Sequence, residues 1–201
     1  MEPLFFEPNE LELIKSEAFF KTRKKIFDNI CIQFQEINNN IEELKSQYDT
    51  LFKQYQSPLN GKISKGENYD GCPYMVLDNP RIYLPNNILA FRTMFMWGKY
   101  FVATFIFKQP DATEHLNLFV NFVDKHVSEN DYLMTGNAMW QHHITDDNYK
   151  LLSKIDLKNL EFILPLEHVK IVRVIPFTAH VDLQTQCMSF YKQCLGIITN
   201  L

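Results

Sequence analysis

The feature that most constrains the fold is an amphipathic segment without Gly or Pro between Asn9 and Gln56. Apolar residues recur along it with alternating spacings of four and three residues. Such a 3.5-residue repeat is typical of a helix packed knobs-into-holes against another helix. The sequence therefore predicts a long helix with an association seam at Ile30, Phe34, Ile37, Ile41, Leu44, Tyr48, Leu51 and Tyr55.

The predicted helix is longer than the rest of the chain can cover. Asn9 is a suitable N-cap with Glu12 as its capping-box partner, and Ser57-Pro58 ends the pattern. Roughly 45 helical residues extend about 65–70 Å, whereas a compact domain of this chain length has a radius of gyration of about 16–17 Å. We therefore expect the seam to bind a protein partner, most simply a second copy in a homodimer, unless the C-terminal helix covers part of it.

The continuity of this helix depends on the triplet Asn38-Asn39-Asn40. Asn has low helix propensity, so the triplet is also compatible with the loop of a helical hairpin. The seam keeps its phase from Ile37 to Ile41, and a loop rarely preserves phase. One continuous helix is favoured.

Three segments follow from the composition along the chain. Residues 1–57 form the helix, or helical hairpin, for association. Residues 58–73 contain two Pro and three Gly and are predicted to be a loop or linker. Residues 74–201 are predicted to be an α+β domain.

A β-hairpin is the clearest local prediction in the third segment. Leu89 to Trp97 and Tyr100 to Lys108 flank Gly98-Lys99, which suits a two-residue type II′ turn. In that register Trp97 faces Tyr100, Phe95 faces Val102 and Phe91 faces Ile106. Both faces of the hairpin are apolar, so we expect both to be covered.

The remaining elements are predicted from periodicity and turn residues. Helices are expected at Leu116–Val127, from Asp146 or Asp147 to Ile155, and from Asp182 to Thr199; strands are expected at Tyr74–Leu77, Arg81–Leu84, Tyr132–Ile144 and Val169–Phe177. The order and the tight hairpins predict an α+β fold, an antiparallel sheet with helices packed on a face.

Charge and composition argue against nucleic acid and membrane partners. Lys and Arg number 20 against 24 Asp and Glu, and the one basic run, Lys21 to Lys25, is interpreted as a solvated helix face. The first residues do not resemble a signal peptide, and no apolar window is long enough to span a bilayer. We expect a cytoplasmic protein whose four Cys are reduced.

No catalytic or metal motif stands out. Adjacent His142 and His143 would point to opposite faces of a strand, and Asp182 of the pair His180-x-Asp182 is explained as a helix cap. Cys72 has no local base. The sequence therefore predicts no catalytic residue, no metal and no cofactor.

Arginine gives the one candidate ligand site. Three of the four Arg, namely Arg81, Arg92 and Arg173, lie in strand-like segments among apolar residues. A half-buried guanidinium needs an acceptor, which is either an anionic ligand or an internal carboxylate. The internal alternatives are Asp78, Asp131 and Glu167.

Three stretches resemble an uncharacterised protein family of Bacteroidota. They are Tyr69 to Arg81, Ala90 to Gly98 and Cys187 to Cys194, about a fifth of the chain. The resemblance implies a bacterial cytosolic setting and no activity. The sequence thus favours a non-enzymatic, self-associating interaction protein; the alternative is a small-molecule or anion-binding domain, or an enzyme of unrecognised type, that uses the three arginines.

Overall fold

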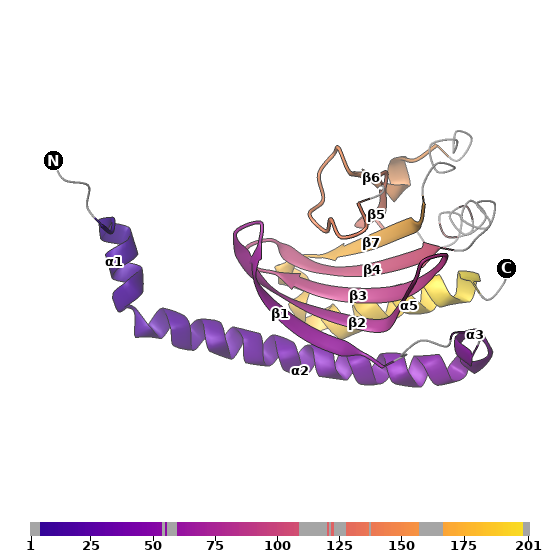
Figure 1. Ribbon diagram of the computed structural model, residues 1–201, viewed down its shortest axis with the longest axis horizontal. Helices are drawn as coiled ribbons and strands as arrows, with labels where there is room; N and C mark the ends of the chain where they lie inside the picture. Colours follow the sequence, from indigo (N-terminus) through magenta and orange to yellow (C-terminus); the bar gives the residue numbers. More distant parts are fainter. Residues whose placement is uncertain are drawn as a thin grey trace.

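The computed structural model contains a long N-terminal helix, a seven-stranded antiparallel sheet and a C-terminal helix, which confirms the predicted α+β class (Figure 1). It describes residues 5–53, 55, 60–108, 120, 122, 128–136, 138–156 and 167–198. The helices are α1 (Pro8–Lys15), α2 (Glu17–Gln47), α3 (Asp49–Lys53) and α5 (Leu183–Ile198), with 3-10 turns η1 (Leu152–Lys154) and η2 (Phe177–Asp182). The strands are β1 (Lys62–Tyr69), β2 (Cys72–Leu84), β3 (Asn87–Met96), β4 (Tyr100–Lys108), β5 (Asp131–Met134), β6 (Tyr149–Leu151) and β7 (Val169–Ile175).

The sheet has the order β1-β2-β3-β4-β7-β5-β6, and its pairings are antiparallel. Helices α2 and α5 pack on one face, here called the helix face (Figure 1). Residues 138–148, here called the cover, lie against the opposite face, here called the cover face. Both faces of the central hairpin are therefore covered, as its apolar residues predicted.

Helix α2 passes through the Asn triplet without a break, so the prediction of a continuous helix is confirmed there. Asn38 has a tertiary role: its side-chain oxygen accepts a hydrogen bond from Asn79 Nδ2 at 2.9 Å. Gly61 lies so close that a Cβ there would come within 1.8 Å of Asn38 Oδ1. Packing against the sheet thus offsets the low helix propensity of the triplet.

The predicted single helix from Asn9 to Gln56 is wrong at both ends. The chain bends at Ser16, whose Oγ accepts the Phe19 N–H at 3.2 Å and caps α2. Upstream, α1 begins after Glu7, whose backbone N–H binds Glu10 Oε2 at 2.7 Å, so the capping box lies two residues before the expected one. Downstream, α2 ends at Gln47 and the short helix α3 follows.

The seam packs on the chain's own sheet and on α5. Six of its eight residues are buried in the main core and the other two are partly buried. Phe34 and Ile37, for example, are fully buried in the cluster that contains Phe101 of the sheet and Leu183 of α5. The expectation that this seam needs an external partner was therefore wrong, and the alternative in which the C-terminal helix covers part of it describes the fold.

The central hairpin forms, but one residue out of the predicted register. Phe95 pairs with Phe101 and Phe91 with Phe105. The turn contains three residues, with Gly98 at φ +74°. Trp97 thereby leaves the ladder and stacks on Phe27 of α2, with ring centroids 6.0 Å apart, so a contact with the helix selects the register.

Segment 58–73 is not simply a loop, because it contains strand β1. Asp70 and Gly71, both with positive φ, connect β1 to β2 in a two-residue hairpin that pairs Tyr69 with Cys72. An Asp-Gly pair between extended segments is a recognised hairpin signal that the interpretation as a linker missed. Gly66 has a packing role, since a Cβ there would lie 2.2 Å from the Tyr74 ring.

The other predicted elements have mixed outcomes. Strand β7 and helix α5 agree with prediction to within two residues. Of the strand expected over Tyr132–Ile144, only β5 forms, because the chain then leaves the sheet to form the cover. In place of the helix expected before Ile155, the chain forms β6 and η1. The helix expected at Leu116–Val127 lies outside the described residues, apart from positions 120 and 122.

Candidate functional site

The three candidate arginines do not meet at one site. Arg173 lies on the helix face, and Arg92 lies on the cover face. The Arg81 Nε donates to the carbonyl oxygen of Asn60 at 3.0 Å. The sheet therefore separates the residues that sequence reasoning grouped together.

Arg173 forms a buried, bidentate ion pair with Asp131 across the β5–β7 ladder. Its Nε and one terminal nitrogen donate to the two carboxylate oxygens at 2.7 and 2.8 Å. Gln193 of α5 accepts a further bond at 3.1 Å. Asp131 has no exposed surface. Its carboxylate therefore occupies the guanidinium of Arg173 at the position where the carboxylate of a ligand would bind.

Arg92 makes the equivalent pair with Asp78 on the cover face, at 2.7 and 2.9 Å. The two residues are direct partners in the β2–β3 ladder. Trp140 of the cover lies over the guanidinium, whose carbon is 4.7 Å from the centre of the indole ring. Two of the internal acceptors named from the sequence, Asp78 and Asp131, are thus the ones that the arginines use.

A polar cluster, here called the latch cluster, consists of Arg92, His142 and Lys170. Lys170 Nζ lies 2.8 Å from the Met139 carbonyl oxygen, 2.6 Å from the Gln141 carbonyl oxygen and 3.3 Å from His142 Nδ1. The other ring nitrogen, His142 Nε2, lies 2.8 Å from a terminal nitrogen of Arg92. Two strands and the cover therefore meet in this cluster.

Burial shifts the pKa of both titratable bases in the latch cluster. Lys170 has no exposed surface and His142 is 3 % exposed. Burial, and then the charge of Arg92, lower the pKa of Lys170 well below its ordinary value. Burial is the main cause that lowers the pKa of His142 well below 6.5, and the charge of Arg92 acts in the same direction.

Three tyrosine hydroxyl groups form hydrogen bonds with the backbone of the cover around this cluster. Tyr69 Oη accepts the N–H groups of His142 and His143 at 2.6 and 2.8 Å. Tyr100 Oη accepts the Ile144 N–H at 3.2 Å, and Tyr149 Oη donates to the Gln141 carbonyl at 2.8 Å. The cover is thus held by polar contacts to β1, β4, β6 and β7.

Lys170 was not selected from the sequence, although its sequence context resembles that of Arg173. Both are cationic residues within the apolar strand β7, and they lie on opposite faces of the sheet. The adjacent histidines do differ in environment as expected: His142 is buried, while His143 lies beside Lys99 and Asp70. Among the described residues no cluster of three or more His, Cys, Asp or Glu has the geometry to hold a metal ion.

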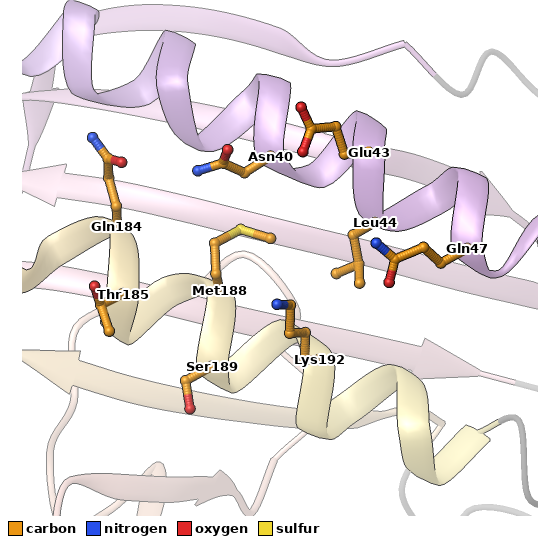
Figure 2. A pocket seen from close by; sticks show the side chains of 9 residues that line it. All are labelled: Asn40, Glu43, Leu44, Gln47, Gln184, Thr185, Met188, Ser189 and Lys192. Atoms are coloured by element: carbon orange, nitrogen blue, oxygen red, sulfur yellow. The ribbon is translucent and has the colours of Figure 1, made fainter.

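A groove of about 580 Å³ runs between α2 and α5 (Figure 2). Its side chains come from both helices: Asn40, Glu43, Leu44, Gln47, Gln184, Thr185, Met188, Ser189 and Lys192. Amides and hydroxyls predominate, and no His or Cys lines it. The groove therefore has the character of a polar boundary between two packed helices.

Seven of the large apolar side chains that are exposed in the described part of the chain lie on residues 5–26, here called the arm. The arm contains α1 and the first turns of α2 and extends away from the sheet (Figure 1). None of its side chains is buried. Its exposed apolar residues are Phe5, Phe6, Leu11, Leu13, Ile14, Phe19 and Phe20, with Phe5 90 % exposed.

No protein-family model matches the chain, and neither curated proteins nor solved structures gave a match. The Bacteroidota resemblance therefore stays a prediction that rests on the three stretches quoted above. Within the described part of the chain, no helix combines the length and apolar character needed to cross a bilayer.

Proposed function

We propose that this chain is a non-enzymatic interaction protein that self-associates through its arm. One observation carries the proposal: seven large apolar side chains are exposed on the arm, and the arm contacts the body near its end, where Arg23 pairs with Glu67 and Ile26 packs on the main core. Contiguous exposed apolar surface on a folded protein usually marks an interface. This proposal keeps the homodimer expected from the sequence and moves its interface from the seam to the arm.

A second copy is the favoured partner because the charges of the arm complement each other in an antiparallel pairing. The first half carries Glu7, Glu10 and Glu12 beside one base, Lys15, and the second half carries the basic run from Lys21 to Lys25 beside one acid, Glu17. Within the chain, Lys21 pairs with Glu17, Arg23 with Glu67 and Lys24 with Asp28, so the pairing would compete with these exposed ion pairs. A two-fold axis near Ser16 would place the acidic half of one arm against the basic half of the other. Cyclic dimers use such self-complementary surfaces.

The same axis also matches the apolar residues. It would bring Leu13 and Ile14 of one copy to the height of Phe20 and Phe19 of the other, because each pair is equidistant from the axis along the chain. The exposed apolar side chains of one arm offer on the order of 700 Å², close to the roughly 800 Å² per partner of a standard interface. The arm is therefore large enough for a specific dimer.

Light scattering coupled to gel filtration tests the proposal. The wild-type protein should have twice the chain mass of 23.8 kDa. The double variant Leu13→Glu, Phe20→Glu should elute as a monomer with an unchanged circular dichroism spectrum, because neither side chain is buried in the body. Ile32→Glu is the matched control: Ile32 is 52 % exposed on α2 outside the arm, and this variant should remain a dimer.

A charge exchange separates a specific pairing from nonspecific apolar association. Glu12→Lys should weaken the dimer, and adding Lys21→Glu should restore it, since the exchanged charges again oppose each other across the axis. A wild-type protein that remains a monomer at 100 µM refutes self-association. Failure of the second exchange to restore the dimer refutes the antiparallel arrangement.

The setting of the protein is part of the same proposal. All four cysteines (Cys31, Cys72, Cys187 and Cys194) are free thiols, which suits a reducing compartment such as the bacterial cytoplasm. Fractionation of cells that express a tagged chain would test this placement.

A further inference from the structure

The hydrogen bonds of the latch cluster restrict its protonation state. A guanidinium has only N–H donors, so the contact between Arg92 and His142 Nε2 requires that Nε2 be the acceptor. A neutral imidazole then carries its proton on Nδ1. That Nδ1–H faces Lys170 Nζ at 3.3 Å.

The partner of this Nδ1–H must be able to accept a hydrogen bond. An ammonium group has no lone pair, whereas a neutral amine has one and keeps two N–H donors. The two carbonyl oxygens of Met139 and Gln141 take those two donors. The contacts are all satisfied together only when His142 and Lys170 are both neutral.

We propose that His142 and Lys170 form a proton-operated latch, which holds the cover on the sheet while both are neutral and releases it when either takes up a proton. A proton on Nε2 of His142 would oppose the Arg92 donor. A proton on Lys170 would oppose the Nδ1–H. Either change places two donors against each other in a buried site, where an unmet hydrogen bond is costly.

The charged and titratable groups around the latch favour the neutral state. Arg92 of β3 contributes a positive charge, and Asp78 of β2 is already paired with it. The Tyr69 ring of β1 is 6.2 Å from the His142 ring, and the Tyr149 ring of β6 is 5.6 Å from Lys170 Nζ. Among the described residues no carboxylate forms an ion pair with Lys170, so a charged amine would be stabilised by the two carbonyl oxygens and the Tyr149 ring but would lack a counter-charge.

Release of the cover would uncover an apolar strip on the sheet. The cover residue Ile144 packs against the cluster that contains Met94, Met96, Val102 and Val172. Exposure of this strip at low pH would make the cover face available for contact. The latch is therefore a conformational device separate from the arm.

Nuclear magnetic resonance of the full chain tests the charge states directly. At pH 8 the ¹⁵N shifts of His142 should identify the Nδ1–H tautomer, and the Lys170 ¹³Cε and ¹⁵Nζ shifts should identify a neutral amine. An Nε2–H tautomer, or a charged Lys170 at pH 8, overturns the proposal.

Amide exchange tests the release. The amides of His142, His143 and Ile144 bind tyrosine hydroxyls, so their protection reports whether the cover is closed. Below the pKa of the group that titrates, their protection factors should fall about tenfold per pH unit, while those of β3 and β4 stay constant. Equal pH dependence in the cover and in the central strands contradicts a local latch.

Two variants distinguish the latch from a purely structural contact. Lys170→Arg carries a permanent charge and should show an unprotected cover even at pH 8, whereas Lys150→Arg, at an exposed lysine of β6, should behave as wild type. His142→Gln keeps a donor and an acceptor but does not titrate, so only the part of the pH response that belongs to Lys170 should remain in this variant. A wild-type response in His142→Gln overturns the role of His142. If Lys170→Arg does not fold, the shifts of the wild-type protein still decide the role of Lys170.

Discussion

At the scale of single residues, the sheet uses two arginines in the same way on its opposite faces. Arg92 and Arg173 each bind the carboxylate of a direct neighbour in the ladder. The second pair is the more deeply buried, with side-chain exposures of 6 % for Arg173 and 0 % for Asp131. A buried pair of this kind is strongly destabilised when one partner alone is removed, because the other charge stays buried.

This leads to a prediction for Arg173. Arg173→Met should lower the free energy of unfolding by about 3–5 kcal/mol, because it leaves the Asp131 carboxylate without a counter-charge. Adding Asp131→Asn should recover part of the loss, since a neutral amide oxygen can still accept the Ser128 N–H that now binds at 2.9 Å. Urea unfolding of the four proteins in this double-mutant cycle measures the coupling. Additive losses would show that the pair is not coupled.

At the scale of elements, α2 divides into two parts with different environments. Its first turns belong to the arm, whereas Phe27 and the seam residues of α2 that follow it are buried against the sheet and α5. The amphipathic pattern is continuous across this division. Burial therefore follows from what lies beside each turn and not from the periodicity of the helix.

A matched pair of Phe substitutions tests this division. In the background of the arm variant Leu13→Glu, Phe34→Ala should lower the free energy of unfolding by about 3–5 kcal/mol, because Phe34 is fully buried in the main core. Phe20→Ala in the same background should change it by less than about 0.5 kcal/mol, because Phe20 is 56 % exposed. Urea unfolding followed by circular dichroism measures both. Similar losses at the two positions would mean that the arm packs on the body.

At the scale of the whole molecule, one core joins the parts that the sequence divided into an association helix and a domain. Side chains from α2, α3, the sheet and α5 belong to the same buried cluster. The opposite face is apolar but is closed around the latch cluster. Global stability should therefore depend on the protonation of groups on that face.

The pH dependence of stability follows from these pKa shifts. Lys170 and His142 have lower pKa values in the folded chain than when unfolded, so the unfolded state binds more protons and stability rises with pH. The contribution of Lys170 is gained as pH rises toward its ordinary pKa of about 10.4, with a slope of at most about 1.4 kcal/mol per pH unit. Burial raises the pKa of Cys187 to about 12 from 9.0, so above pH 9 the loss of the thiol proton in the unfolded chain opposes the rise caused by Lys170.

Urea unfolding between pH 5 and 10 checks this dependence, and Lys170→Met is its control because the variant lacks the titrating amine. A wild-type stability that is flat or falls from pH 7 to 9 would contradict a neutral Lys170. Loss of the slope in Lys170→Met, with the change above pH 9 retained, would assign the effect to this residue.

The sequence by itself determined which sides of the elements are apolar. The seam of α2, the two-faced hairpin, strand β7 and helix α5 all follow from the spacing of apolar residues, because period and handedness fix which residues share a face. The Asp-Gly turn before β2 could also be predicted from its two residues alone.

Only the tertiary structure decided what covers each face. The seam meets the chain's own sheet, and the hairpin shifts by one residue so that Trp97 can stack on Phe27. Arg92, His142 and Lys170 lie far apart along the chain, and the topology of the sheet brings them together. The spacing of apolar residues predicts that a side chain is buried. Which residues it packs against depends on how whole helices and strands are placed relative to one another, and local spacing does not determine that placement.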